Sequence, residues 1–113
     1  MTSLSDIQAR AVSLQRSHNW PDKVPEIRLA YLISEVGELA RDLISLTSLE
    51  TNCQREDSQA ITTADEIETL KCHFADEIYD VIWNACDLAR ITGVDLEAAI
   101  ARVDQRNQSR SWR

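Results

Sequence analysis

The residues best suited to chemistry are two pairs of carboxylic acids. Glu35 and Glu38 stand in the stretch SEVGE, and Glu77 and Asp80 stand in DEIYD. A spacing of three residues puts both side chains of a pair on the same side of an α-helix. Four carboxylates contributed by two helices would supply the oxygen ligands that Mg²⁺ or Mn²⁺ prefers. The sequence therefore predicts a divalent-metal site at these four acids.

The second pair lies at the edge of an apolar helix face. Polar residues recur there at spacings of four and three and form one stripe: His73, Glu77, Asp80, Asn84 and Asp87. On a helical wheel, Glu77 and Asn84 lie only about 40–60° from the centre of the neighbouring apolar stripe. A carboxylate buried at such an edge is costly unless it is paired or binds a cation. This placement indicates a metal or a cationic partner.

Other interpretations of the acids fit the sequence less well. Zn²⁺ prefers His and Cys ligands, and we do not expect those residues to lie with the acids. Di-iron bundles use Glu-x-x-His pairs, and the chain contains none. A solvated acidic face is the structural alternative, but Glu35, Glu38 and Asp42 would repel one another, and only Arg41 is interleaved among them.

Four helices are expected to position the acids. Periodicity and capping signals place them at 3–16, 25–46, 64–91 and from 95 onward. Segments 17–24 and 47–63 are predicted loops, because Pro21 interrupts the first and the second is polar without a sustained period. Packing the second helix antiparallel to the third would bring the acidic pairs together. We therefore predict an all-α, four-helix-bundle-like fold in a single domain, 1–113.

Capping residues define the predicted helix ends. A box of the S-x-x-D type begins the first helix at Ser3, and a T-x-x-E box would begin the third at Thr63. Gly93 would end the third helix, since glycine readily adopts the left-handed conformation found there. Asp95 would cap the fourth.

Composition limits the partners and the compartment. The formal net charge is −7, which argues against a nucleic-acid or anionic-membrane partner. Cys53, Cys72 and Cys86 are odd in number and form no CxxC pair, so free thiols in a reducing cytosol are expected. No apolar run reaches membrane-spanning length, and no signal-peptide pattern is present, so we expect a cytoplasmic protein.

The apolar arc of the helix at 25–46 is wider than one neighbouring helix requires. Its residues are Leu29, Ile33, Val36, Ala40 and Leu43, widened by Leu32, Leu39 and Leu46. The arc spans about 140°. Because a chain of this size buries only a modest core, oligomerisation would help to stabilise it. We expect a homodimer or a dimer of dimers.

The ordered motifs resemble a known family, the all-α nucleoside triphosphate pyrophosphatases of the MazG-like and dCTPase-like kind. The resemblance rests on E-V-G-E-L and on D-E-I-x-D-V-I-W. It continues through L-A-R-I-T-G-V-D-L-E-A-A and the closing N-Q-S-R-S-W.

The resemblance implies a metal-dependent hydrolase that cleaves a (deoxy)nucleoside triphosphate to the monophosphate and pyrophosphate, in a nucleotide-pool-cleaning role. By the same resemblance, Glu35, Glu38, Glu77 and Asp80 would hold Mg²⁺ or Mn²⁺, and Glu35 or Glu38 would be the general base. The candidate substrate-binding residues are Trp20, Lys23, Asn84, Asn107 and Arg110. Two alternatives stay open: a phosphoribosyl-ATP pyrophosphohydrolase-like enzyme, and a non-catalytic helical dimerisation or regulatory module.

Overall fold

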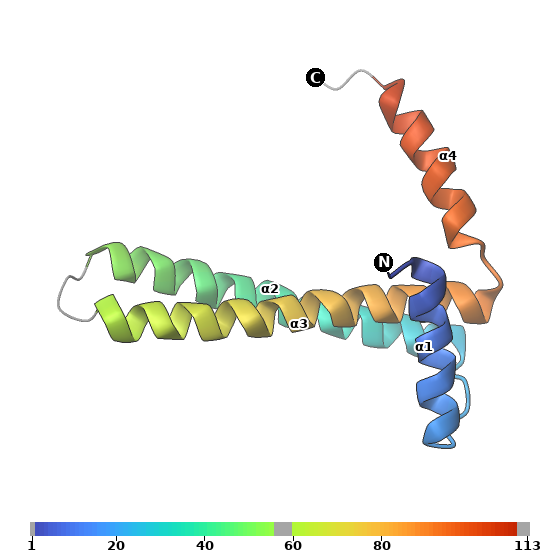
Figure 1. Cartoon of the computed structure of the whole chain (residues 1–113), viewed down its shortest axis with the longest axis horizontal. Helices are drawn as coiled ribbons and strands as arrows, with labels where there is room; N and C mark the ends of the chain where they lie inside the picture. Colours follow the sequence, from blue (N-terminus) through green and yellow to red (C-terminus); the bar gives the residue numbers. More distant parts are fainter. Residues whose placement is uncertain (1, 56–59, 111–113) are drawn as a thin grey trace. The chain divides into compact units, whose positions relative to one another are not determined.

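The computed structural model describes the backbone of residues 2–55 and 60–110 and the side chains of 2–51 and 64–110. Its helices are α1 (Leu4–Ser17), α2 (Pro25–Arg55), α3 (Ala60–Thr92) and α4 (Leu96–Gln108), as Figure 1 shows. Within these described ranges there is no β-strand. The predicted all-α fold class is therefore confirmed.

The chain divides into two compact units. Unit 1 combines Met1–Leu29 with Trp83–Arg113, and unit 2 is Ala30–Ile82. Helices α2 and α3 each contribute to both units. That 1–113 forms one domain stays a prediction.

Helices α1 and α4 in unit 1 begin at the predicted capping residues. The Ser3 hydroxyl accepts a hydrogen bond from the backbone N–H of Asp6, and the Asp6 carboxylate accepts one from the Ser3 N–H. Asp95 caps α4 by accepting from the N–H of Ala98 at 3.0 Å. The apolar core of this unit is small and centres on Ala11, which is fully buried, and Cys86, which is 1% exposed.

Gly93 ends α3 as predicted. Its φ is +71°, a conformation that residues with a Cβ rarely adopt. The N–H of Gly93 donates to the carbonyl of Arg90, and the N–H of Val94 donates to that of Ala89. This pair of bonds is the Schellman pattern, which satisfies carbonyls at the end of a helix that otherwise have no partner.

Unit 2 is an antiparallel helical hairpin made of residues 30–55 of α2 and 60–82 of α3 (Figure 1). Carboxylate oxygens of Glu35 lie with those of Glu77 and Asp80, whereas Asp42 lies with His73 and Glu77. Later residues of α2 thus meet earlier residues of α3, as antiparallel helices require. The predicted antiparallel packing is confirmed.

The predicted loop at 47–63 is wrong. Residues 47–55 continue α2, residues 60–63 belong to α3, and only 56–59 lie outside the described residues. The hydroxyls of Thr47 and Thr51 donate to the carbonyls of Leu43 and Thr47, both at 2.9 Å. Hydroxyls bonded back in this way are satisfied inside a helix, so a polar composition does not interrupt it. The predicted cap at Thr63 is also wrong, because α3 begins earlier, at Ala60.

The wide apolar arc of α2 divides into two parts in unit 2. Leu46 is buried, and Leu32 and Leu39 are half-buried. Ile33 is instead 63% exposed, and Val36 and Leu43 are exposed as well. One side of the arc therefore packs within the chain and the other faces outward.

Other sequence predictions concern the cysteines and membranes. Cys72 is exposed and Cys86 is buried, and both are free thiols as expected, whereas the side chain of Cys53 lies outside the described residues. Burial raises the pKa of the Cys86 thiol. In the described part of the chain, no helix combines the length and apolar character needed to cross a bilayer.

Candidate metal centre

Three of the four predicted metal ligands converge in unit 2. Glu35 comes from α2, and Glu77 and Asp80 come from α3 one turn apart. One carboxylate oxygen of each lies within 4.8 Å of the others. We call this group the acidic trio. Its geometry follows from the antiparallel hairpin and from the three-residue spacing on α3.

Burial makes the acidic trio electrostatically unusual. Glu77 is 8% exposed, as its place beside the apolar stripe predicted. Within the described residues, Oε2 of Glu35 and Oε2 of Glu77 are both buried and have no hydrogen-bond partner. A buried carboxylate oxygen without a donor is strongly disfavoured unless it meets a positive charge.

The pKa of Glu35 reports the same imbalance. It is raised from 4.5 to about 7, chiefly by desolvation and then by the hydrogen bond with Glu77. The negative charges of Glu38, Asp80 and Glu77 raise it further. Every one of these contributions disfavours the ionised carboxylate, and the positive charge of a bound cation would oppose them.

The donor atoms fit a hard divalent cation. All ligands in the acidic trio are carboxylate oxygens, which Mg²⁺ and Mn²⁺ prefer. The two buried oxygens without partners are the atoms that a cation would satisfy. Mg²⁺ keeps several waters and takes few protein ligands, so three carboxylates are sufficient.

Glu38, the fourth predicted ligand, is exposed and belongs to neither group of converging ligand atoms in the described residues. Its charge is nevertheless close enough to raise the pKa of Glu35. It lies one turn after Glu35 on the same side of α2. The structure therefore places it beside the acidic trio rather than within it.

A second group in unit 2 contains a histidine. Nε2 of His73 lies 3.2 Å from Oδ2 of Asp42 and 3.5 Å from Oε1 of Glu77. The expectation that no histidine would lie with the acids is wrong, because the antiparallel register brings His73 opposite Asp42. The sequence carried a signal for it: His73 and Glu77 are four residues apart, and Asp42 continues the line of Glu35 and Glu38 on α2.

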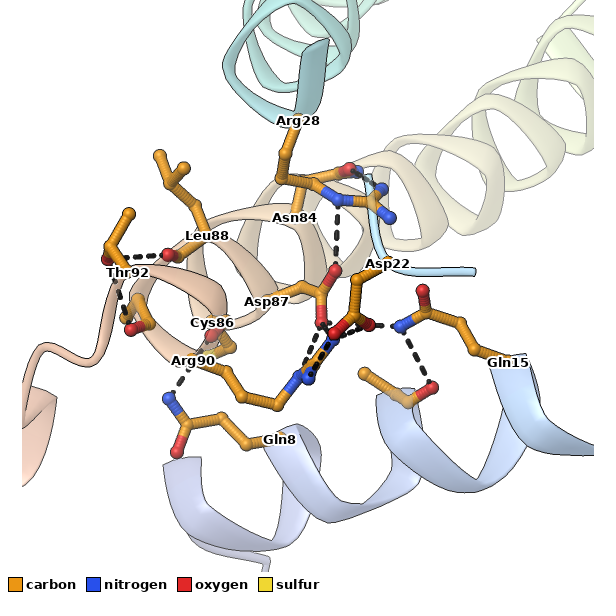
Figure 2. A network of polar contacts seen from close by, with 12 residues as sticks. Gln8, Gln15, Asp22, Arg28, Asn84, Cys86, Asp87, Leu88, Arg90 and Thr92 are labelled. Carbon is orange, nitrogen blue, oxygen red and sulfur yellow. Dashed lines mark hydrogen bonds and ion pairs between the residues drawn. The ribbon is translucent and has the colours of Figure 1, made fainter. Parts of the chain in front are cut away.

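Unit 1 holds a network of paired charges that sequence reasoning missed (Figure 2). Asp87 is fully buried and receives Arg28 Nε at 3.0 Å and Arg90 Nη2 at 2.7 Å. Arg90 also pairs with Asp22 at 2.8 Å, and Nε2 of Gln15 donates to Asp87 at 3.4 Å. Here the buried carboxylate is compensated by cations of the chain itself.

The five candidate substrate-binding residues all belong to unit 1. Asn84 is buried, and its side-chain oxygen accepts a hydrogen bond from Arg28 Nη1 at 2.9 Å (Figure 2). Trp20 is 54% exposed and stacks on His18, with ring centroids 4.4 Å apart.

The other three candidates in unit 1 are polar or charged residues, one between α1 and α2 and two at the end of α4. Lys23 is half-buried in the segment before α2. Asn107 and Arg110 are exposed at the end of α4, where the N–H of Arg110 donates to the carbonyl of Asn107. The acids lie in unit 2, so a joint role for the two sets stays a prediction.

Comparison with known proteins gives one relative of similar size. No family model matches the chain. No solved structure matches it either. A protein of Bacillus subtilis (strain 168), described as "Uncharacterized protein YvdC", is 31% identical over 94 residues, which cover 83% of this chain and 82% of that protein. Since this identity extends over most of both chains, the protein belongs to the same family as YvdC.

Proposed function

We propose that this protein is a metal-dependent nucleoside triphosphate pyrophosphohydrolase that yields a nucleoside monophosphate and pyrophosphate. The observation that carries the proposal is the acidic trio of Glu35, Glu77 and Asp80, whose oxygens lie within 4.8 Å of one another. The buried oxygens of Glu35 and Glu77 without hydrogen-bond partners support a cation there. The motifs around these acids support the choice of a nucleotide as substrate.

The acids would have divided roles. Glu35, Glu77 and Asp80 would hold Mg²⁺, with Mn²⁺ as a substitute. The ion would neutralise the triphosphate and lower the pKa of a bound water. Glu38 completes the predicted ligand set from its exposed place beside the trio. Either Glu35 or Glu38 would accept a proton from that water.

Residues of unit 1 would bind the substrate. Lys23, Asn107 and Arg110 carry groups that pair with phosphates, and Trp20 offers an exposed ring on which a base can stack. Asn84 would contact the sugar or base. Its hydrogen bond with Arg28 fixes the orientation of its side chain.

The proposed assembly is a homodimer or a dimer of dimers. Its support is the outward side of the α2 arc in unit 2, where Ile33, Val36 and Leu43 are all exposed. Apolar side chains gathered on one helix face are typical of an interface between subunits. Sedimentation at micromolar concentration is expected to give at least a dimer, and a stable monomer would contradict this assembly.

The test is a screen for pyrophosphate release from canonical and modified nucleoside triphosphates and from phosphoribosyl-ATP, with and without Mg²⁺. The wild type should release pyrophosphate only with the metal. Glu38→Gln, Glu77→Gln and Asp80→Asn should lower turnover by at least about 100-fold, because each removes a charge that positions metal and water. Glu68→Gln, an exposed acid of α3, is the matched control and should retain activity.

The screen also separates the alternatives. Release from phosphoribosyl-ATP alone would favour the related pyrophosphohydrolase. No turnover on any nucleotide would favour the non-catalytic helical module. Near-wild-type turnover by Glu38→Gln on a good substrate would exclude Glu38 from the catalytic site.

A further inference from the structure

Asp42, His73 and Glu77 form a second group of potential ligands in unit 2, adjacent to the acidic trio. One donor atom of each lies within 4.8 Å of the others. His73 and Glu77 stand one turn apart on α3, and Asp42 faces them from α2. Histidine and a second ligand four residues apart on one helix is a spacing that metalloenzymes use for transition ions.

The distances match a coordination sphere. Two ligand atoms that each lie about 2.0–2.2 Å from a metal are separated by about 2.8–3.6 Å at octahedral or tetrahedral angles. Nε2 of His73 lies 3.2 Å from Oδ2 of Asp42 and 3.5 Å from Oε1 of Glu77. These two separations therefore fit a coordination sphere.

Burial provides an independent sign of a missing partner. Glu77 as a whole is 8% exposed, and its Oε2 is buried without a hydrogen-bond partner while Oε1 faces His73. Oδ2 of Asp42 is buried as well, and the nitrogen that faces it is Nε2 of His73. The side chain of His73 is 56% exposed, so an ion could enter from solvent and keep water ligands on that side.

We propose that Asp42, His73 and Glu77 form a second cation site, which binds a divalent transition ion of the Zn²⁺ or Co²⁺ kind and shares Glu77 with the acidic trio. The imidazole nitrogen favours a transition ion at this site, because it is a better ligand for Zn²⁺, Co²⁺ and Ni²⁺ than for Mg²⁺. The site goes beyond the proposed hydrolase activity and does not depend on it. With both sites occupied, the two carboxylate oxygens of Glu77 would serve neighbouring ions.

The first experiment uses NMR of the full chain, with ¹⁵N-labelled histidine and saturating Mg²⁺. The chain contains two histidines, and His18 in unit 1 is an internal control. Adding Zn²⁺ should shift the ring nitrogens of His73 and leave those of His18 unchanged. If neither responds, or His18 responds instead, the site does not exist.

The second experiment measures Co²⁺ affinity by calorimetry and visible absorption, again in excess Mg²⁺. His73→Gln should weaken Co²⁺ binding by about 10–100-fold or more, the loss typical of damage to a metal site. Because the His73 side chain is largely exposed, this variant should keep its fold, which circular dichroism checks. Asp80→Asn changes only the acidic trio and should retain most of the Co²⁺ affinity.

The outcomes separate this inference from the proposed function. If Asp80→Asn abolishes Co²⁺ binding while His73→Gln has no effect, the ion occupies the acidic trio and the second site is refuted. If the wild type does not bind Co²⁺, His73 serves only as a partner of two carboxylates. If His73→Gln weakens Co²⁺ binding and Asp80→Asn does not, but the wild type hydrolyses no nucleotide, the second site is supported and the proposed function is wrong.

Discussion

Helix α3 carries two buried carboxylates whose surroundings differ in charge. Asp87 in unit 1 is fully buried and contacts the guanidinium groups of Arg28 and Arg90. Glu77 in unit 2 is almost as buried, yet its neighbours include the carboxylates of Glu35 and Asp80. The imidazole of the exposed His73 lies 3.5 Å from its Oε1, and its Oε2 has no hydrogen-bond partner in the described residues.

The difference separates a structural carboxylate from a candidate functional one. Burial of a charge is tolerated when the chain supplies the opposite charge, as it does around Asp87. Around Glu77 the chain gathers like charges instead, and the pKa of Glu35 rises to about 7 as a result of burial and of these neighbours. A site that is unfavourable without a ligand is a candidate for binding one. Three substitutions test this contrast.

The largest effect on stability is expected at Asp87. Asp87→Asn should lower the free energy of unfolding by about 3–5 kcal/mol, because it leaves the buried guanidinium group of Arg28 without its anion. Urea unfolding followed by circular dichroism measures the change. A loss of unfolding free energy below about 1 kcal/mol is what an exposed ion pair contributes. Such a result would contradict the claim that Asp87 is stabilised by its charge partners in a way that Glu77 is not.

Glu35→Gln should change how stability depends on pH in the metal-free protein. Glu35 ionises near 4.5 when unfolded and near 7 when folded, so between these values the folded chain holds a proton that the unfolded chain has lost. Stability from this group is therefore greatest at low pH and falls as pH rises to about 7. Glu35→Gln should lack this decrease in stability with rising pH.

Unfolding of wild type and Glu35→Gln in EDTA at several pH values tests this sign. Subtracting the two curves removes the contributions of other acids, such as Asp22, whose pKa is lowered by its hydrogen bond with Arg90. The wild type should lose stability relative to the variant as pH rises from 4.5 to about 7. A difference that stays constant would show that Glu35 has an ordinary pKa, and one that rises with pH would show that its pKa is lowered; either contradicts the prediction.

The smallest effect is expected at Asp22, the exposed end of the unit 1 network. Its side chain is 58% exposed, so Asp22→Asn should cost less than about 1 kcal/mol, and less still at high salt. Because its folded pKa is lowered from 3.8, this contribution should vanish as pH falls below that range. A loss as large as that of Asp87→Asn would mean that burial does not set the value of these pairs.

Local patterns in the sequence predicted part of this picture correctly. The helical wheel places Glu77 and Asn84 at the edge of the apolar face, and both are buried. Gly93 ends α3 and Asp95 caps α4, because their effects act within a few residues.

Contacts between distant segments could not be predicted in the same way. Arg28 and Asn84 are 56 residues apart in sequence, and nothing local to either shows that they meet. The contact between Asp42 and His73 depends likewise on the register of two helices. The error at 47–63 has a different origin: threonine hydroxyls bonded to Leu43 and Thr47 let a polar segment remain helical.

The most direct test of the central claim, that the acidic trio binds a divalent cation, is thermal unfolding of wild type, Glu35→Gln and the control Glu68→Gln, each in EDTA and in Mg²⁺. In EDTA, Glu35→Gln should be at least as stable as the wild type, because it relieves repulsion within the trio. In Mg²⁺ at about 100 times its dissociation constant, the wild type and control should gain about 2.7 kcal/mol, and Glu35→Gln should gain much less. Melting temperatures that do not respond to Mg²⁺, or that rise equally in all three proteins, would contradict the claim.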